Sequence, residues 1–321
     1  MSRKWGCEKC DGLGYRTQPQ LTRTRATQIL ALCDCVEALC RVCPGDQVSP
    51  YVYLDEKSGR ILPCDCKGAR DSFSRVKDLF SHSNIPLKYR MHRLREFNLQ
   101  PQYPNPTKSP ELENARRQAT IALTAAFDRA RLFIEAQKKL LADPKQVTPA
   151  DLKGLLLIGP PGTGKSLLAA MILNELIITA RMSCRYIKIS RDFFQQLRAT
   201  FSNDSGTYGR TDSVFNEIAR QDVLVIDDFG IQSDSEWEQR TLYDLIDARY
   251  ENDLPTIITS NIDLDAVRNL FKGRIYSRFT EMLHTVEFFQ LRDYRQHIHS
   301  NPCLDGWVGH ATEKLYRLMR R

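Results

Sequence analysis

A short glycine-rich segment limits the fold of this chain more than any other feature. Residues 159–166 read Gly-Pro-Pro-Gly-Thr-Gly-Lys-Ser and fill every fixed position of the phosphate-binding loop G-x-x-x-x-G-K-[ST]. An apolar run at 155–158 precedes the loop and a helical pattern at 167–180 follows it, so the loop joins a strand to a helix. In that setting backbone N–H groups can close on a polyphosphate, and the helix N-terminus adds a favourable dipole.

These residues predict a site for a nucleoside triphosphate and Mg²⁺. Lys165 would reach the β and γ phosphates, and Ser166 would offer its hydroxyl oxygen to the metal. The expected nucleotide contacts are Gly159, Pro160, Pro161, Gly162, Thr163, Gly164, Lys165, Ser166 and Leu167.

A second element of such a site follows at residues 222–228, where an apolar run ends in two carboxylates, Asp227 and Asp228. Strand ends of this kind lie at the ligand-binding edge of a parallel sheet. Asp227 is expected to bind Mg²⁺ together with the nucleotide, and Asp228 to orient or deprotonate the attacking water. The alternative is an ordinary strand that ends in a polar turn, and the phosphate loop upstream argues against it.

Three further residues are candidates for catalysis. Asn261 follows an apolar run at 256–260 and is expected to sense the γ-phosphate and water, unless it only caps the strand. Arg274 and Arg278 are four residues apart, so they would share one face of a helix. A guanidinium supplied by a neighbouring subunit could stabilise charge on the transferring phosphoryl group. Arg278 is the first candidate and Arg274 the second, and the alternative is a pair of solvated surface arginines.

Strands and helices alternate from residue 154 onward, which predicts an α/β fold with a five-stranded parallel sheet flanked by helices. The expected strands are 155–158, 185–189, 223–227, 256–260 and 284–290. One long helix is expected at 111–141, after a proline-rich linker. The expected division is a cysteine-rich domain at 1–80, a lead-in segment and linker at 81–110, a nucleotide-binding domain at 111–292 and a tail at 293–321.

Eight of the ten cysteines form a repeat in which C-x₂-C is followed by C-x-C. The first half holds Cys7, Cys10, Cys33 and Cys35, and the second holds Cys40, Cys43, Cys64 and Cys66. Four thiolates per half suit a tetrahedral structural Zn²⁺ site. The metal would supply folding energy to a segment with few large apolar residues.

The simplest pairing of these cysteines gives each half its own Zn²⁺. Exchange of ligands between the halves and an iron–sulfur cluster stay open as alternatives, because the ligand count fits them as well. Disulfides are disfavoured if the protein is cytoplasmic.

Together these motifs resemble the AAA+ ATPases, and within them the DnaC/DnaI helicase loaders and the related IstB transposition ATPases. The resemblance rests on the phosphate loop with its strand, on Val-Ile-Asp-Asp-Phe-Gly at 225–230, on Ala-Arg-Tyr at 248–250 and on Thr-Ser-Asn at 259–261. An Ile-Pro-x-x-Tyr-Arg segment at 85–90 looks like the lead-in to the ATPase domain in this family, and the match covers residues 84 to about 292.

The resemblance implies ATP bound between the subunits of a homo-oligomer, contact with single-stranded DNA and delivery of a replicative DNA helicase. It also implies an inserted helical segment that meets DNA, which residues 193–210 would supply. Aromatic and cationic side chains suit unpaired bases and phosphates, so Arg198, Phe201 and Arg210 are the candidate contacts. The core alternative stays open for Phe201 and Arg198, whereas helical spacing favours a buried stripe of Phe193, Phe194 and Leu197.

The two ends of the chain bear on this resemblance in different ways. Only about 30 residues follow the last expected strand, too few for the full C-terminal lid of many AAA+ proteins, and helicase loaders of this type often lack it too. At the other end, DnaI-type loaders carry an N-terminal zinc-binding domain that grips the helicase. The cysteine-rich segment is expected to do the same, although its two sites differ from a single-zinc domain.

The first interpretation of function is an ATP-dependent helicase loader in DNA replication initiation. The alternatives are an IstB-like transposition helper ATPase and a zinc-dependent ATP-binding adaptor with little hydrolysis. No apolar run reaches the roughly 18 residues that span a bilayer, so a cytoplasmic location without membrane contact is expected. The formal charge of +7 lies wholly in residues 1–110 (18 basic minus 11 acidic), where metal-bound thiolates would offset part of it. A basic patch that contacts DNA stays open, but net charge alone does not establish one.

Overall fold

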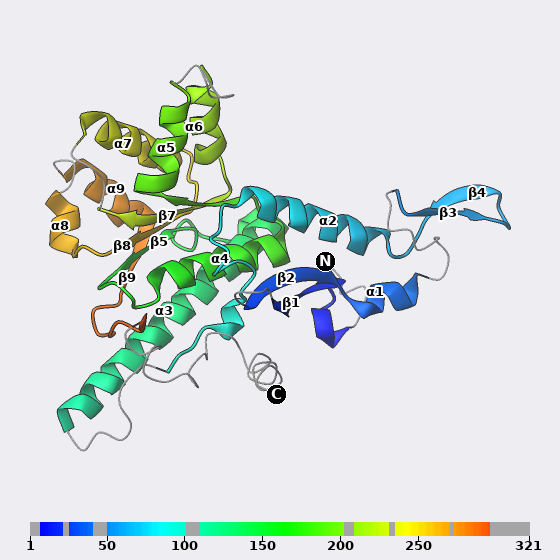
Figure 1. The fold of residues 1–321 in the computed structure, drawn as a ribbon, viewed down its shortest axis with the longest axis horizontal. Helices are drawn as coiled ribbons and strands as arrows, with labels where there is room; N and C mark the ends of the chain where they lie inside the picture. Colours follow the sequence, from blue (N-terminus) through cyan, green and yellow to red (C-terminus); the bar gives the residue numbers. More distant parts are fainter. Residues whose placement is uncertain are drawn as a thin grey trace. The chain divides into compact units, whose positions relative to one another are not determined.

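The computed structural model of the chain describes residues 7–21, 26–40, 50–100, 110–201, 209–230, 235–269 and 273–295. These residues form two compact units, Met1–His82 and Ser83–Arg321, which are described separately (Figure 1). We call Met1–His82 the cysteine-rich unit.

The cysteine-rich unit contains two antiparallel hairpins and two helices. Its elements in chain order are η1 (Glu8–Cys10), β1 (Tyr15–Leu21), β2 (Ala26–Leu32), α1 (Asp34–Leu39), β3 (Val52–Asp55), β4 (Arg60–Pro63) and α2 (Lys67–His82). A small core joins Val36 and Ala69 to the buried thiols of Cys64 and Cys66. The cysteines are therefore part of the packing of this unit.

The second unit is built on one parallel sheet. Its elements in chain order are η2 (Leu94–Glu96), α3 (Pro110–Ala142), η3 (Pro144–Gln146), β5 (Gly154–Ile158), α4 (Lys165–Ala180), β6 (Cys184–Lys188), η4 (Ile189–Phe193), α5 (Phe194–Ala199), α6 (Thr211–Ala219), β7 (Val223–Phe229), α7 (Glu236–Glu251), β8 (Thr256–Ser260), α8 (Leu264–Asn269), α9 (Arg274–Met282) and β9 (Leu283–Glu287).

The five strands lie in the order β6-β7-β8-β5-β9, and every neighbouring pair is parallel. The chain passes from β5 through α4 to β6 at one edge, returns strand by strand to β8, and ends with β9 on the other side of β5. The loop after β5 therefore opens at the place where the strand order reverses, which is where ligands bind in open α/β sheets. The expected five-stranded parallel sheet is confirmed.

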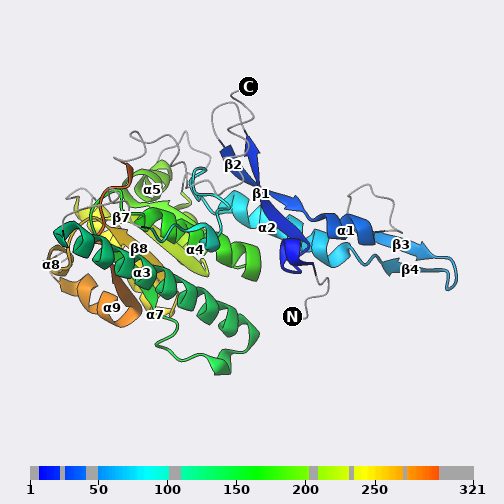
Figure 2. The same ribbon diagram turned by 90° about the horizontal axis from the view of Figure 1, so that it is seen from below.

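Helices cover both faces of this sheet (Figure 2). On one face α4 contacts β6, β7 and β8, and α3 contacts both α4 and β9. On the other face a core of apolar side chains from the strands packs against residues of η4, α5, α7 and α9. This core includes Phe193, Phe194 and Leu197, so the expected buried stripe is confirmed.

The lead-in segment after Ser83 is bound to the helix that follows the phosphate loop. Arg93 donates two hydrogen bonds of 2.7 Å to the two carboxylate oxygens of Glu175 on α4. The side-chain amide of Asn174, the residue before Glu175, donates to the carbonyls of Tyr89 and His92, at 2.7 and 3.0 Å. A bidentate ion pair and two amide contacts therefore fix this segment to α4.

The observed elements match the expected ones closely except at one strand. The long helix expected at 111–141 runs from Pro110 to Ala142. The last strand was expected to run to residue 290 but ends at Glu287. Glu287 pairs with Ile158, the last residue of β5, and the N–H of Phe288 makes the final hydrogen bond of this pairing, to the carbonyl of Ile158. Because β5 ends there, β9 ends with it.

Candidate nucleotide site and metal sites

Two glycines let the chain fold tightly after β5. Gly162 has φ +77° and Gly159 has φ +145°, both in the region that favours glycine. A Cβ atom at Gly162 would overlap the carboxylate of Asp293, and one at Gly159 would lie 2.8 Å from the Cβ of Phe288. The loop therefore packs against the chain that follows β9, and the N–H of Tyr294 donates to the carbonyl of Gly162 at 3.0 Å. The sequence had given no sign of this contact.

Lys165 is the first residue of α4 and is only 5% exposed. Its Nζ donates hydrogen bonds of 2.6 and 2.7 Å to the carbonyls of Gly159 and Pro160. Burial lowers the pKa of Lys165 to about 8, although Asp227 and Asp228 act in the opposite direction. The ammonium group of Lys165 is thus held by carbonyl groups of the predicted phosphate-binding loop itself.

Asp227 lies at the centre of a short hydrogen-bond network. Its Oδ1 accepts from the hydroxyl of Ser166 and from the hydroxyl of Thr259, each at 2.6 Å. Asp227 is 1% exposed, and its Oδ2 accepts no hydrogen bond from the described residues. A buried carboxylate oxygen without a donor, beside a serine hydroxyl, has the chemistry of a Mg²⁺ ligand set. The residues present therefore fit the predicted metal.

Asp228 adopts a left-handed backbone conformation with φ +60°, which is unusual outside glycine. It lies where the pairing of β7 with β8 shifts between Ile226 and Phe229. This irregularity lets consecutive carboxylates face the same region, because a regular strand would point them to opposite faces. Strain of this kind is found at functional sites, and the N–H of Asp228 is tied to Thr259 Oγ1 at 3.1 Å.

Thr259 is the residue of the fourth strand that reaches the carboxylates. It donates to Asp227 and accepts from Asp228, and it is 1% exposed. Asn261, the sequence candidate, follows the end of β8 and is half-buried. Its role as a sensor stays a prediction. The motif Thr-Ser-Asn contained Thr259, but nothing in the sequence showed which of the three side chains faces Asp227.

Several known proteins are similar to this chain. The family described as "IstB-like ATP binding protein" matches residues 133–289. Replicative helicase loader DnaC of Escherichia coli (strain K12) is 30% identical over 156 residues, which are 48% of this chain and 62% of that protein. The protein of the same name from Buchnera aphidicola subsp. Acyrthosiphon pisum (strain APS) is 25% identical over 182 residues, 56% of this chain and 72% of that protein.

Among solved structures, the crystal structure of the DnaC helicase loader is 20% identical, with a TM-score of 0.45, and covers 63% of this chain and 99% of that one. Residues 133–289 are therefore similar to the IstB-like ATP-binding proteins over just under half of the chain. The second unit has the phosphate loop and the five-stranded parallel sheet expected of an AAA+ nucleotide-binding module and is similar in sequence to DnaC, and we call it the AAA+ unit. The chain spans 62% of the length of the Escherichia coli relative.

The two candidate trans-acting arginines of the AAA+ unit differ in their surroundings. Arg278 pairs with Asp247 on α7, with Nε at 2.6 Å from Oδ1, and its guanidinium lies 4.8 Å from the centre of the Tyr243 ring. Arg274, one turn earlier on α9, is exposed. Arg278 would have to leave Asp247 to reach a neighbouring subunit, whereas Arg274 is already on the surface.

The candidate DNA contacts lie at the end of α5 and the start of α6. Arg198 is an ion-pair partner of the buried Glu238, and its guanidinium lies 5.6 Å from the centre of the Trp237 ring. Phe201 is 57% exposed and meets Trp237 edge-on at 6.0 Å. Arg210 is exposed. Trp237, which no local sequence pattern marks as a site residue, contacts both Arg198 and Phe201, so the three side chains form one aromatic and cationic surface.

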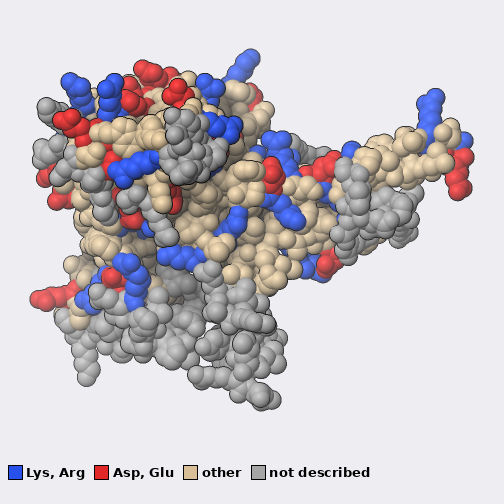
Figure 3. Space-filling model, turned by 45° about the horizontal axis from the view of Figure 1, so that its top comes forward, with Lys and Arg blue, Asp and Glu red and all other residues tan. Residues whose placement is uncertain are grey.

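Charge is mixed on the surface of the AAA+ unit. On the face that Figure 3 shows, Lys and Arg side chains are interspersed with Asp and Glu side chains. Glu238 also offsets the charge of Arg198 locally. Any attraction for DNA at this surface would therefore come from stacking more than from a wide basic field.

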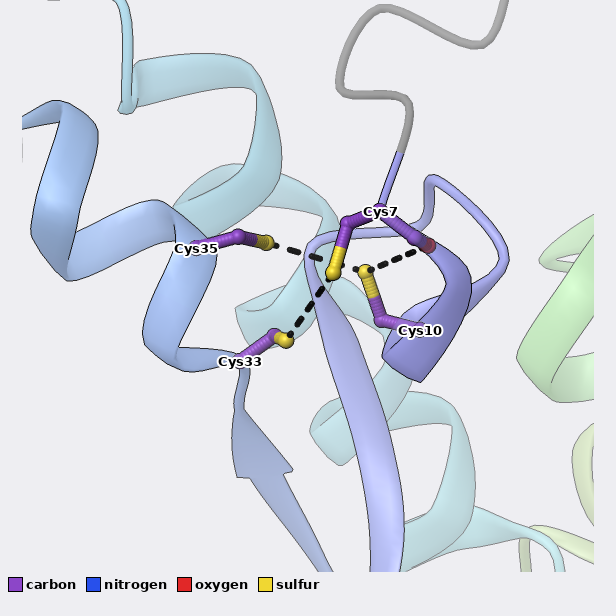
Figure 4. A group of neighbouring side chains, drawn as sticks. All are labelled: Cys7, Cys10, Cys33 and Cys35. Carbon is purple, nitrogen blue, oxygen red and sulfur yellow. Dashed lines mark hydrogen bonds between the residues drawn. The ribbon is translucent and has the colours of Figure 1, made fainter.

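The first four cysteines converge as the sequence predicted. The Sγ atoms of Cys7, Cys10, Cys33 and Cys35 all lie within 4.8 Å of one another, and they point toward a common centre (Figure 4). The Cys7–Cys33 and Cys10–Cys35 sulfur distances are 3.8 and 3.7 Å. A tetrahedral Zn²⁺ site with Zn–S bonds of about 2.3 Å requires sulfur separations of about 3.8 Å. The thiols therefore fit zinc.

A second cluster joins Cys40, Cys64 and Cys66, again with all sulfurs within 4.8 Å. The Cys40–Cys64 and Cys64–Cys66 sulfur distances are 3.9 and 3.5 Å. Cys43, the expected fourth ligand, lies outside the described residues. The clusters keep the two halves of the repeat separate, which favours the simple pairing over exchange of ligands between halves.

Gly14, which follows the first two cysteines, lies close to helix α2. Gly14 has φ +83°, and its N–H donates to the Cys10 sulfur at 3.3 Å. A Cβ at this position would lie 2.6 Å from the Cβ of Ala69, which follows Cys66 by three residues on α2. Gly14 thus permits both an N–H···S contact to the first cluster and the close approach of α2, the helix that begins directly after Cys66.

No helix among the described residues is long and apolar enough to cross a membrane.

Proposed function

We propose that this protein is an ATP-dependent loader of a replicative DNA helicase, acting in the cytoplasm during replication initiation. The observation that carries the proposal is the Ser166–Asp227–Thr259 network beside the phosphate loop, in a chain that is 30% identical over 156 residues to a replicative helicase loader. The network supports a role that depends on bound nucleotide, and the relative indicates a replicative helicase as the class of partner. The whole activity rests on similarity over part of the relative's length.

The proposed nucleotide is ATP with Mg²⁺, and the residues that would hold the metal are Ser166 and Asp227. Bound Mg²⁺ would neutralise charge on the β- and γ-phosphates. Lys165 would leave its loop carbonyls for the phosphates, and Asp228 would take the proton of a water whose oxygen attacks the γ-phosphorus. The bond to the bridging oxygen then breaks, and ADP leaves.

The proposed assembly is a homo-oligomer in the ATP state, with an arginine of α9 from a neighbouring subunit at the γ-phosphate. Arg278 keeps the role given to it from the sequence if it exchanges Asp247 for phosphate, and Arg274 is the second candidate. ATPase turnover at saturating protein separates them: the arginine that acts in trans should lose turnover when changed to Ala, while ATP binding persists.

The proposed DNA-binding surface comprises Arg198, Phe201, Trp237 and Arg210. The exposed ring of Phe201 and the planar guanidinium of Arg198 suit stacking with unpaired bases. Trp237→Ala should weaken binding of a labelled single-stranded oligonucleotide, whereas Tyr276→Ala, on α9, should not. Equal affinities of these two variants would remove this surface from the proposal.

The proposed role of the cysteine-rich unit is to bind two Zn²⁺ ions and contact the helicase. The decisive experiment is capture of the purified helicase by the full chain, with and without ATP. Capture should depend on ATP and fail in Lys165→Ala, but persist in Lys153→Ala, which changes a lysine that donates only to the Thr280 carbonyl among the described residues. ATP binding without any helicase capture would overturn the loader proposal.

An IstB-like transposition helper is the second candidate, because the matching family is IstB-like. ATP-dependent capture of a transposase in place of the helicase would favour it. A third outcome, ATP binding with turnover equal in wild type and Asp228→Asn, would identify an adaptor that does not use hydrolysis.

A further inference from the structure

One lysine at the nucleotide site has no part in the roles described above. Lys188 is the last residue of β6, and the parallel register of β6 and β7 pairs it with Asp227. Its Nζ lies 3.2 Å from Asp228 Oδ2 and 3.6 Å from Asp227 Oδ2. The side chain is 40% exposed, so it can leave this position without disturbing the core.

Lys188 balances the charge of the site. Asp227 and Asp228 contribute two negative charges, and Lys165 and Lys188 contribute two positive charges, so the four side chains sum to zero. A lysine side chain that is 40% exposed and lies beside two carboxylates carries its positive charge at neutral pH.

Lys188 also lies beside the oxygen that a metal would need. Asp227 Oδ1 is already taken by Ser166 and Thr259, and Oδ2 accepts no hydrogen bond from the described residues. The charged group nearest to Oδ2 in the described ion pairs is the Lys188 ammonium. An ammonium ion and a divalent cation at this oxygen would repel each other, so the two compete for the same carboxylate.

We propose that Lys188 is a built-in counter-ion that keeps free divalent metal away from Asp227 and Asp228, so that metal binds there only together with nucleotide. This inference rests on the proposed Mg²⁺–ATP site and adds the residue that sets its metal selectivity. Nucleotide phosphates add enough negative charge to hold both the metal and the two lysines. Lys188 thus makes the site respond to the metal–nucleotide complex and not to free metal.

Binding of Mn²⁺, a spectroscopic substitute for Mg²⁺, tests this proposal in the zinc-loaded full chain without nucleotide. Electron paramagnetic resonance of free Mn²⁺ gives the dissociation constant directly. Lys188→Met should bind Mn²⁺ more tightly than wild type, on the order of tenfold, because one positive charge a few ångströms from the metal is removed. Lys153→Met, which removes a lysine before β5, should bind as wild type does.

Two further variants separate charge from folding. Lys188→Arg keeps the charge and should retain wild-type Mn²⁺ affinity, whereas Lys188→Gln should resemble Lys188→Met even if one variant proves unstable. The double change Lys188→Met with Asp227→Asn should lose the gained affinity. Unchanged Mn²⁺ affinity in both Lys188→Met and Lys188→Gln, in folded protein that still binds ATP, would overturn the inference. Failure of wild type to bind ATP would instead overturn the proposed function.

Discussion

Every residue of β5 and β8 in the AAA+ unit is buried, whereas β3 and β4 of the cysteine-rich unit leave all of their side chains partly or largely exposed. The AAA+ sheet lies between two layers of helices and is stabilised by removal of apolar surface from water. The cysteine-rich unit has four buried residues in its small core, and two of them are cysteines. Its fold therefore depends on thiol chemistry to a degree that the AAA+ fold does not.

The two units also differ in the buried polar groups that join their separate segments. In the AAA+ unit Arg249 is fully buried and donates hydrogen bonds to the hydroxyl of Thr256 and to the carbonyls of Ala219, Gln221 and Pro255. It joins the end of α7 to the starts of β7 and β8 without a metal. In the cysteine-rich unit the comparable role of joining separate segments falls to the sulfur clusters.

Metal removal should separate the two units most clearly. Structural Zn²⁺ supplies on the order of 10 kcal/mol of folding free energy in small domains, so its loss should unfold the cysteine-rich unit and spare the AAA+ unit. Hydrogen exchange should show lost protection in residues 7–82 and unchanged protection in β5 to β8. Cys66→Ala should lower the metal content below two ions per chain, while Cys184→Ala, a buried cysteine outside the clusters, should not. If residues 7–82 kept their hydrogen-exchange protection after chelation, the fold of the cysteine-rich unit would not depend on metal.

Substitution of the buried Arg249 should destabilise the AAA+ unit and leave the cysteine-rich unit unchanged. Arg249→Met removes four hydrogen bonds to buried or partly buried acceptors, which should lower the free energy of unfolding by about 4 kcal/mol. Burial lowers the pKa of Arg249 to about 9. Because the buried cation is itself unfavourable, its removal offsets part of the loss in unfolding free energy. Urea unfolding measures the change, with Arg268→Ala on the exposed side of α8 expected near zero. A neutral Arg249→Met would show that apolar packing alone holds these segments.

A glycine pair tests how tightly the cysteine-rich unit is packed. Gly14→Ala combines a positive φ with a 2.6 Å approach to the Ala69 Cβ, and should cost about 2–3 kcal/mol. Gly59→Ala has a similar φ of +61° but no atom within 4 Å, and should cost only about 1 kcal/mol. Thermal unfolding of the zinc-loaded protein gives both values. Equal costs would mean that Ala69 does not press on the first cluster.

The smallest expected effect is a pH dependence of nucleotide binding in the AAA+ unit. Lys165 binds phosphate as an ammonium ion, and its pKa of about 8 in the free protein means that it loses its proton as the pH rises. ATP affinity should therefore fall above pH 8, by about tenfold per pH unit at most. Lys165→Arg stays charged and should show no such fall, which a fluorescent ATP analogue can measure. A flat profile in wild type would show that the ammonium keeps its ordinary pKa.

Local sequence signals predicted the strands well because burial of both faces leaves continuous apolar runs. The run at 256–260 coincides with β8, and those at 155–158 and 185–189 differ from β5 and β6 by one residue. The end of β9 was missed because it depends on where its partner strand β5 ends, at Ile158, which is far from Glu287 in the chain. Thr259 and Trp237 were missed for the same reason, since their contacts come from other elements.

The sequence by itself determined the phosphate loop, the paired carboxylates and the grouping of the cysteines, because each depends on spacing along a short stretch of chain. Tertiary structure alone decided which side chains meet. The register between β6 and β7 places Lys188 against Asp227, and the irregularity in β7 turns Asp228 toward the same region. Packing against α7 places Arg278 on Asp247. Such contacts join residues that share no local pattern, so only the folded chain brings their charges within a few ångströms.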